Sequence, residues 1–236
     1  MNGPSETPYT PDYYRAIQAS ARRSAAVIVP LVMELAAPQS VVDVGCGAGT
    51  WLAAFAEHGV DDVLGVDSDS VDPTMLEIPT ERFQVADLGS PLEIGRQFDL
   101  VVSLEVAEHL PPASADGFVE SLTRLGSLIL FSAAIPHQGG AGHLNEQWPA
   151  YWSRRFEDRG FEPVDYLRQR VWDDDRVEWW YAQNMLVFAT PAELEQRMAL
   201  AHHRTSRPPA PLVHPAKYRL LVEWAASLKE AQHGSP

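Results

Sequence analysis

The run VVDVGCGAGTW at residues 41–51 constrains the fold more than any other segment. Val41 to Val44 are typical of a buried strand, and Gly45, Gly47 and Gly49 give a bare backbone at which a strand can turn sharply into a helix. Such a helix offers its first backbone N–H groups to a ligand. Because Thr50 stands where the dinucleotide fingerprint has its last glycine, the loop is not shaped for a pyrophosphate. The segment therefore predicts a strand, a ligand-binding loop and a helix, and disfavours a nicotinamide cofactor.

Strand-like and helix-like segments alternate along most of the remaining chain. We expect strands at 63–66, 82–86, 98–104 and 128–133, with helices at 51–58 and 113–125. Continuous apolar strands in such an alternation predict a parallel sheet covered on both faces. Segments 161–167 and 178–189 are strand-like and predict an antiparallel pair at one edge. Helices are expected before the sheet at 13–20 and 24–36, with Ser24 as an N-cap, and after it from Thr190 to His203 and at 217–228.

The string at 41–51 resembles motif I of the class I S-adenosylmethionine-dependent methyltransferases. VLGVD, FQVAD and FDLVVSLEVAEHL follow in the order of that family's later motifs, to about Thr190. The resemblance implies a Rossmann-like α/β fold with a seven-stranded, mostly parallel sheet, S-adenosylmethionine as cofactor and S-adenosylhomocysteine as product. It implies a small-molecule methyltransferase of the bacterial secondary-metabolism type. We expect one domain over 1–236, with an N-terminal helical cap (1–38), a core (39–190) and a C-terminal helical appendage (191–236).

Acidic residues stand at the carboxyl ends of the predicted strands, where an open α/β sheet places its ligand crevice. Asp67, 22 positions after Gly45, is placed to accept two hydrogen bonds from a ribose diol, or else to cap the turn that follows it. The resemblance implies that Asp87 accepts from the adenine amine while Leu88 packs near the ring. The alternative for Asp87 is an N-cap before Ser90.

The resemblance places Glu105 and Asp43 near the methionine end of the cofactor, where the two carboxylates balance the ammonium and sulfonium charges. Asp43 can equally act as a scaffold that holds the amides of the glycine loop. The predicted cofactor-binding residues are Asp43, Gly45, Gly47, Gly49, Trp51, Asp67, Ser68, Asp87, Leu88 and Glu105.

The segment E-x-x-E-H, formed by Glu105, Glu108 and His109, places three potential ligands for a divalent cation on one helical face. It resembles the metal-binding segment of ubiquinone-pathway O-methyltransferases and of small-RNA 3′-end methyltransferases, and His137 or His143 would complete the set. The competing interpretation is a cofactor-contacting turn of the kind found in metal-free methyltransferases. We adopt that interpretation and predict no metal ligand.

The polar loop PHQGGAGHLNEQ at 136–147 follows the predicted strand 128–133 and holds the candidate catalytic residues His143, His137 and Glu146, in that order. Methyl transfer is an in-line displacement that needs an aligned nucleophile, and a hydroxyl or ammonium must also lose a proton. The pKa of histidine suits proton uptake at neutral pH. The alternative is that His143 and Asn145 only brace the loop. Five of the seven tryptophans lie between 148 and 180 and form either a substrate pocket or ordinary core.

The formal net charge of −14 would repel a phosphate backbone, so a nucleic-acid substrate is not expected. Residues 197–236 hold six basic and two acidic residues, a tail that can dock on its own acidic body, dock on a second subunit in a homodimer, or remain solvated. No run of about 18 apolar residues and no secretion signal are present, which predicts a cytoplasmic protein without a membrane partner. The single cysteine, Cys46, excludes an intrachain disulfide.

We therefore expect an enzyme that moves a methyl group from S-adenosylmethionine to a hydroxyl, or an amine, of a small-molecule acceptor in natural-product biosynthesis. Three other functions are weighed against it. They are a metal-assisted RNA methyltransferase, a non-catalytic cofactor-binding subunit and a nicotinamide oxidoreductase. The acidic net charge disfavours the RNA methyltransferase. The histidines of the loop 136–147 disfavour the non-catalytic subunit, and Thr50 disfavours the oxidoreductase.

Overall fold

A computed structural model describes residues 11–205 and 208–233, and within them a single seven-stranded sheet has the order β3-β2-β1-β4-β5-β7-β6. The first five strands of the chain run parallel, and β7 pairs antiparallel with both β5 and β6. This confirms the predicted α/β sheet and its antiparallel edge pair. The strands are β1 Ser40–Val44, β2 Asp62–Asp67, β3 Phe83–Val85, β4 Leu100–Leu104, β5 Leu128–Ser132, β6 Glu162–Val164 and β7 Leu186–Ala189.

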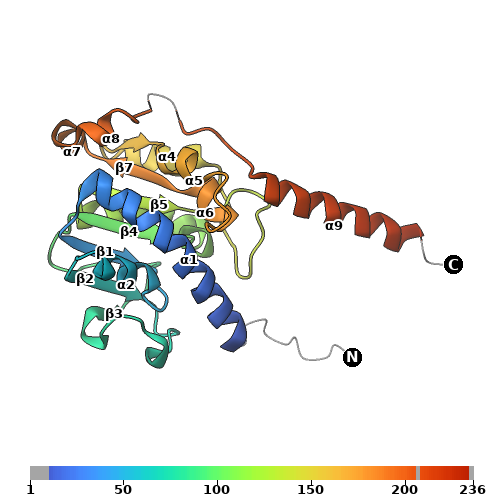
Figure 1. Ribbon diagram of the computed structural model, residues 1–236, viewed down its shortest axis with the longest axis horizontal. Coiled ribbons are helices and arrows are strands. Elements are labelled where there is room, and N and C mark those ends of the chain that lie inside the picture. The colour runs from blue at the N-terminus through green and yellow to red at the C-terminus, as the bar shows by residue number, and fades with distance from the viewer. Residues whose placement is uncertain (1–10, 206–207, 234–236) are drawn as a thin grey trace.

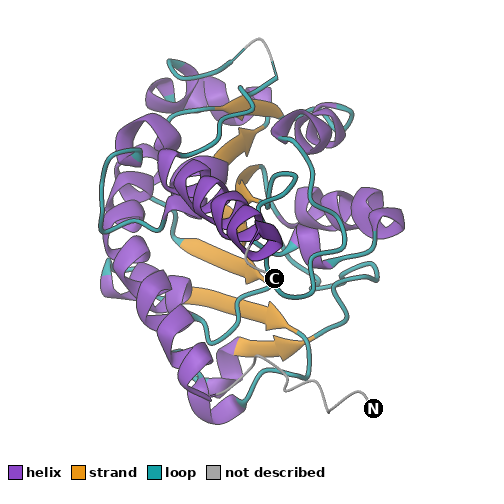
Figure 2. Cartoon of the chain, turned by 90° about the vertical axis from the view of Figure 1, so that its right-hand side faces the viewer, coloured by secondary structure: helices purple, strands orange, loops and turns teal. Residues whose placement is uncertain are grey.

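Helices cover both faces of the sheet (Figures 1 and 2). One set of strand residues, including Val41 and Leu100, packs with α1, α2 and α5 to α8, and the alternate set, including Val42 and Val101, packs with α3 and α4. Side chains that alternate between two buried faces explain why β4, β5 and β7 are buried along their whole length. The helices are α1 Pro11–Ala36, α2 Thr50–Glu57, α3 Ala115–Leu125, α4 Pro149–Glu157, α5 Leu167–Val171, α6 Trp179–Asn184, α7 Pro191–Gln196, α8 Met198–Ala201 and α9 Pro215–His233.

Helix α1 is continuous, so the prediction of two helices with Ser24 as an N-cap is wrong. The Ser24 side chain is fully buried, and its hydroxyl donates to the Ser20 carbonyl at 3.0 Å and accepts from the Glu178 amide at 3.0 Å. A serine hydroxyl can be satisfied in mid-helix by the carbonyl four residues earlier. The serine therefore serves the packing of α1 against the loop before α6 rather than a helix start.

The prediction of strands over 161–167 and 178–189 is only partly right. Strand β6 has three residues, α5 begins at Leu167, and Trp179–Asn184 forms the helix α6 before β7 begins at Leu186. Aromatic residues favour strands in general, but such preferences yield to tertiary packing. Here the helical turn buries Tyr181, Gln183 and Asn184. The predicted helix from Thr190 to His203 is divided into α7 and α8 at Arg197.

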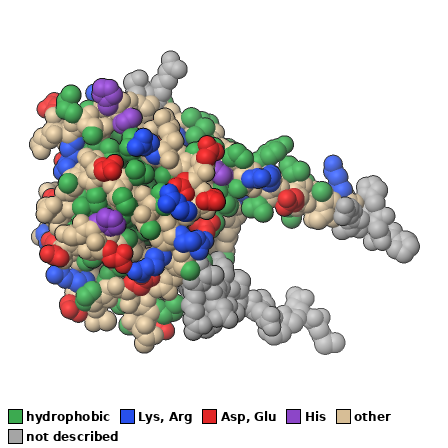
Figure 3. Space-filling model, viewed as in Figure 1, with side chains coloured by type: hydrophobic (Ala, Val, Ile, Leu, Met, Phe, Trp, Pro, Cys, Tyr) green, Lys and Arg blue, Asp and Glu red, His purple; other side chains and the backbone are tan. Residues whose placement is uncertain are grey.

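Helix α9 extends well beyond the expected 217–228 and projects from the body of the protein (Figure 1). Its exposed side chains include Tyr218, Trp224 and Leu228, and Figure 3 shows hydrophobic groups along it. The first ten residues of the predicted N-terminal cap, and Arg207, lie outside the described residues. Among the described residues, no helix combines the length and the apolar character needed to span a membrane. The division into cap, core and appendage stays a prediction.

Candidate active site

The site lies where the order of the sheet reverses, between the adjacent strands β1 and β4. In open α/β sheets the loops that leave such a pair open a crevice at the carboxyl ends of the strands. The loop after β1 turns at Gly45, where φ is +84°, and a Cβ placed there would lie 2.3 Å from Cγ2 of Val106 in the turn after β4. Only glycine fits this contact, so the two loops pack directly against each other.

Asp67, at the end of β2, holds the glycine loop in place. One carboxylate oxygen accepts from the Gly47 amide at 2.7 Å, and the other accepts from the Ser68 amide at 2.7 Å. Each oxygen keeps a second acceptor site, because a carboxylate oxygen has two lone pairs. The turn-capping contact is thus observed, and the ribose contact stays a prediction that this geometry allows.

Two carboxylates stand at the tips of β1 and β4, of which Asp43 is buried and Glu105 is half-buried. Asp43 is 2% exposed, and burial together with the charge of Asp67 raises its pKa well above the usual value. Glu105 follows β4 with φ +55°, and burial raises its pKa although hydrogen-bond donors oppose this. Its carboxylate accepts from the side-chain amide of Asn184 at 3.0 Å and from that of Gln138 at 2.7 Å.

Gln138, Gln183 and Asn184 form a buried amide cluster around Glu105. The side-chain oxygen of Gln138 accepts from Asn184 at 2.8 Å and from Gln183 at 3.1 Å. No sequence pattern indicated these three residues. Single amides in a polar loop and in an aromatic run carry no periodic signal, so only the fold reveals that they meet.

The remaining predicted cofactor residues are less centrally placed. Asp87 is exposed, and hydrogen bonds from the Ser90 hydroxyl and the Gly89 amide lower its pKa, which is the local turn contact considered as its alternative role. Leu88 is buried with α3. The Ser68 hydroxyl lies 2.6 Å from that of Ser70. Trp51 is 5% exposed and packs edge-on against Tyr181. Their contacts with a nucleoside stay predictions.

The loop 136–147 is organised by Glu146. Its carboxylate accepts from the backbone amides of His137 and Gly139, both at 2.7 Å, and lies 2.9 Å from Nδ1 of His143. Burial acts to raise the pKa of Glu146, but these three hydrogen bonds outweigh it and the pKa is lowered. Glu146 is therefore placed to orient His143 and the loop. His137 is exposed and has φ +66°.

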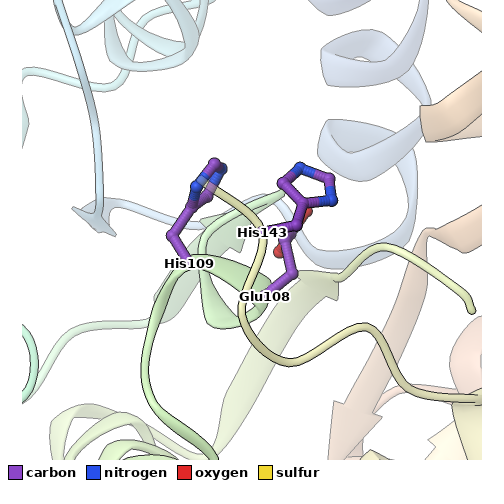
Figure 4. Close-up of side chains that lie close together, drawn as sticks. All are labelled: Glu108, His109 and His143. Atoms are coloured by element: carbon purple, nitrogen blue, oxygen red, sulfur yellow. The ribbon is translucent and has the colours of Figure 1, made fainter. Parts of the chain in front are cut away.

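Glu108, His109 and His143 converge in front of the tip of β4 (Figure 4). One potential ligand atom from each lies within 4.8 Å of the others, and the two imidazole rings meet edge to face at 4.8 Å. Glu108 is fully buried, and neither carboxylate oxygen has a hydrogen-bond partner within the described part of the chain. Backbone amides of Leu144 and Asn145 donate to the Glu108 carbonyl and tie the loop to this turn.

The electrostatics of this cluster fit a divalent cation. Burial, followed by the charge of Glu105, raises the pKa of Glu108 well above its usual value, whereas burial and His143 lower the pKa of His109. A carboxylate that has no hydrogen-bond partner among the described residues, beside two imidazoles, is a suitable donor set for such an ion. Of the E-x-x-E-H residues, the structure groups Glu108 and His109 with His143, whereas Glu105 is held by the amide cluster.

The tryptophan-rich segment serves more than one purpose. Trp152 is 2% exposed and packs against Phe131 in the core, whereas Trp148 is 41% exposed beside the loop 136–147. Trp179 and Trp180 lie on α6 rather than on the edge strands. The segment therefore contributes to both core and surface.

This strand order, with a glycine loop after β1 and carboxylates at the tips of β1, β2 and β4, defines a class I S-adenosylmethionine-dependent methyltransferase. The chain belongs to the family described as "Methyltransferase domain", which matches residues 15–201. The predicted fold and family are thereby confirmed.

Individual relatives cover parts of the chain. The ubiquinone biosynthesis O-methyltransferase of Acinetobacter baylyi is 33% identical over 105 residues, which are 41% of this chain and 44% of that protein. The ribosomal protein L11 methyltransferase of Laribacter hongkongensis is 33% identical over 119 residues, 48% of this chain and 38% of that protein. The matches thus span less than half the length of these curated relatives.

A solved structure with the same fold is that of CalS10 with bound S-adenosylmethionine, an aminopentose methyltransferase of calicheamicin biosynthesis from Micromonospora echinaspora. It has a TM-score of 0.56 and 15% identity, over 79% of this chain and 99% of CalS10. The sugar N-methyltransferase KedS8 from Streptoalloteichus has a TM-score of 0.56 and 16% identity, over 80% of this chain and 98% of KedS8. At these identities the likeness concerns the fold.

Proposed function

We propose that this methyltransferase moves the methyl group of S-adenosylmethionine to a hydroxyl or an amine of a small molecule. The observation that carries the proposal is a pair of carboxylates, the buried Asp43 and the half-buried Glu105, beside a glycine loop held by Asp67. Burying carboxylates is costly unless a positive charge offsets it. S-adenosylmethionine brings a sulfonium and an ammonium group to such a site.

The acceptor class is proposed from the relatives. The ubiquinone biosynthesis relative is an O-methyltransferase, and CalS10 and KedS8 are sugar methyltransferases. A natural-product acceptor agrees with CalS10, and the net charge of −14 disfavours a nucleic acid.

His143 is the proposed general base. With Nδ1 held by Glu146, a neutral ring carries its proton on Nδ1 and leaves Nε2 free to accept one. The acceptor oxygen then forms a bond with the methyl carbon, the S–CH3 bond breaks with its electron pair going to sulfur, and the hydroxyl proton goes to His143. The products are the methylated acceptor and S-adenosylhomocysteine.

A second candidate, divalent-metal assistance, is favoured by the two oxygens of Glu108, which have no hydrogen-bond partner among the described residues and lie beside His109 and His143. In this version these three residues would hold the cation. The ion would lower the pKa of an acceptor hydroxyl by Lewis-acid polarisation. His143 would then be a ligand oriented by Glu146, so the two candidates assign different roles to the same imidazole.

Calorimetry with S-adenosylhomocysteine on ligand-stripped protein tests the cofactor assignment. We expect binding at one site, and the absence of heat would contradict the proposal. Release of S-adenosylhomocysteine in the presence of hydroxylated or aminated small molecules then identifies the acceptor.

Chelation separates the two candidates. Metal assistance predicts that EDTA abolishes turnover and that Glu108→Gln loses Mn²⁺ binding while keeping affinity for S-adenosylhomocysteine. General-base catalysis predicts turnover that survives EDTA and falls by about 10²-fold or more in His143→Ala.

A further inference from the structure

Lys217 is one of two lysines in a chain with 16 arginines, and it is buried, with 9% of its surface exposed, in the first turn of α9. Its ammonium donates to the backbone carbonyl of Gln138 at 2.6 Å and lies 5.9 Å from the centre of the Trp179 ring. Burying an ammonium costs free energy unless its partners replace the lost water. An exposed lysine can serve solubility, but a buried one such as Lys217 must have another role.

Gln138 connects Lys217 to the reacting site. It lies in the loop 136–147, 79 residues before Lys217 in sequence, and its side-chain amide donates to Glu105 at 2.7 Å. Gln138 also follows His137 directly, and the backbone amide of His137 donates a hydrogen bond to the Glu146 carboxylate. A tether on the Gln138 carbonyl therefore acts on both the loop that carries His143 and the amide that holds Glu105.

The segment 208–214, which precedes α9, is itself fixed to the body and so places Lys217 next to Gln138. The His214 amide donates to the side-chain oxygen of Gln183 at 2.9 Å, and its Nε2 lies 2.8 Å from the Trp172 carbonyl. Arg168, 1% exposed, donates to the Ala210 carbonyl at 2.9 Å. Beyond Lys217, α9 leaves the body (Figure 1). The C-terminal segment is thus anchored at the amide cluster.

We propose that Lys217 is a positioning residue for methyl transfer, which tethers the loop 136–147 and, through Gln138, the carboxylate of Glu105. The C-terminal segment then belongs to the catalytic unit, although its helix extends away from it. This rests on the proposed function, in which Glu105 faces the cofactor and the loop carries the acceptor side of the site. A flexible stem with a compact ammonium suits a single carbonyl better than the wider fork of arginine.

Full-length Lys217→Met and Lys217→Arg proteins test the proposal, with Lys229→Met as the matched control because Lys229 is exposed near the far end of α9. In ligand-free protein we expect Lys217→Met to speed amide hydrogen exchange at His137 and Gly139 by about tenfold while β4 and β5 exchange as before. Its dissociation constant for S-adenosylhomocysteine should rise by about tenfold. Lys217→Arg should recover part of both effects, and Lys229→Met should match the wild type.

Unchanged loop exchange and unchanged affinity in Lys217→Met would overturn the proposal. If that variant fails to fold, acetylation of the wild-type lysines decides. We then expect Lys217 to react at least about tenfold more slowly than Lys229, and more slowly still with S-adenosylhomocysteine bound. A Lys217 rate that the ligand does not change would refute the coupling to the site. If the wild type binds no S-adenosylhomocysteine, the proposed function fails, while the ligand-free exchange still tests the tether.

Discussion

Three acidic side chains lie at the tips of β1 and β4, the buried Asp43 and Glu108 and the half-buried Glu105, and loss of water around each carboxyl raises its pKa. Such carboxylates cost stability in the ligand-free protein. Their partners differ, because Glu105 is held by amides whereas both oxygens of Glu108 are unpartnered among the described residues. We infer that Asp43 and Glu105 serve a cationic cofactor, and that Glu108 serves a separate ion or proton next to the acceptor.

Replacement of Asp67 by asparagine should weaken cofactor binding. The new amide nitrogen would face either the Gly47 or the Ser68 amide, so one of two hydrogen bonds that shape the loop is lost and donors oppose each other. We expect affinity for S-adenosylhomocysteine in calorimetry to fall by about tenfold or more. Asp69→Asn, an exposed neighbour in the same turn, is the control and should bind normally. Equal affinity in both variants would remove Asp67 from the site.

Residues of the site differ in how far the sequence could reveal them. Asp43, Asp67 and Glu105 could be placed in advance, because the carboxyl ends of parallel strands meet at one edge of a sheet. The E-x-x-E-H spacing indicated Glu108 and His109, but it could not say which histidine joins them. Gln138 and Lys217 had no such signal, since their contacts join residues 33 and 79 positions apart.

At the scale of elements, the β1 to α2 unit was predicted almost to the residue because each of its glycines has a local reason. Helix α6 was not, since a run rich in aromatic residues favours a strand until the burial of Gln183 and Asn184 is known. The division between α7 and α8 at Arg197 likewise coincides with a tertiary contact, because the Arg197 guanidinium donates to the Ala36 carbonyl at the end of α1. In this chain the glycine turn after β1 can therefore be predicted from local sequence, whereas the structure around the edge strands β6 and β7 cannot.

The two glycines of the loop should differ in their tolerance of alanine. At Gly45 an alanine Cβ would lie 2.3 Å from Val106, and the φ of +84° is also unfavourable for alanine. At Gly47 no atom lies near the added Cβ, so only the φ of +54° is unfavourable. We expect the free energy of unfolding, measured with urea, to fall by about 1–2 kcal/mol for Gly47→Ala and by about 2–5 kcal/mol for Gly45→Ala. Equal losses would show that the contact with Val106 relaxes freely.

Helices α4 and α9 offer a second comparison. Trp152 on α4 is 2% exposed, and Trp224 on α9 is 63% exposed. Trp152→Ala should lower the free energy of unfolding by about 3–5 kcal/mol through the cavity it leaves. Trp224→Ala should change it by no more than about 0.5 kcal/mol in dilute protein. A large loss for Trp224→Ala would mean that α9 is buried in solution.

For the whole molecule, the order of the sheet decides where the charges meet. Parallel strands joined by crossover helices place β1 and β4 side by side, so that acidic residues far apart in sequence gather at one edge. The chain as a whole carries a net charge of −14. The net negative charge of the chain therefore opposes the binding of a further anion at the site. A cationic ligand is favoured both by the carboxylates of the site and by the net charge of the chain.

Stability should depend on pH in a way that exposes the buried Asp43. Its pKa is raised by burial and by Asp67, so between its unfolded value near 3.8 and its higher folded value the native state binds the extra proton. Its contribution to stability is complete below the unfolded pKa and is lost as the pH rises, by up to about 1.4 kcal/mol per pH unit.

Urea unfolding of ligand-free protein at pH 5, 6.5 and 8 should show this loss in the wild type relative to Asp43→Asn. Lowering of the His109 pKa acts in the opposite direction, but it is common to both proteins and cancels in the difference. Parallel curves for the two proteins would mean that Asp43 titrates normally and that no cation is needed to offset its charge.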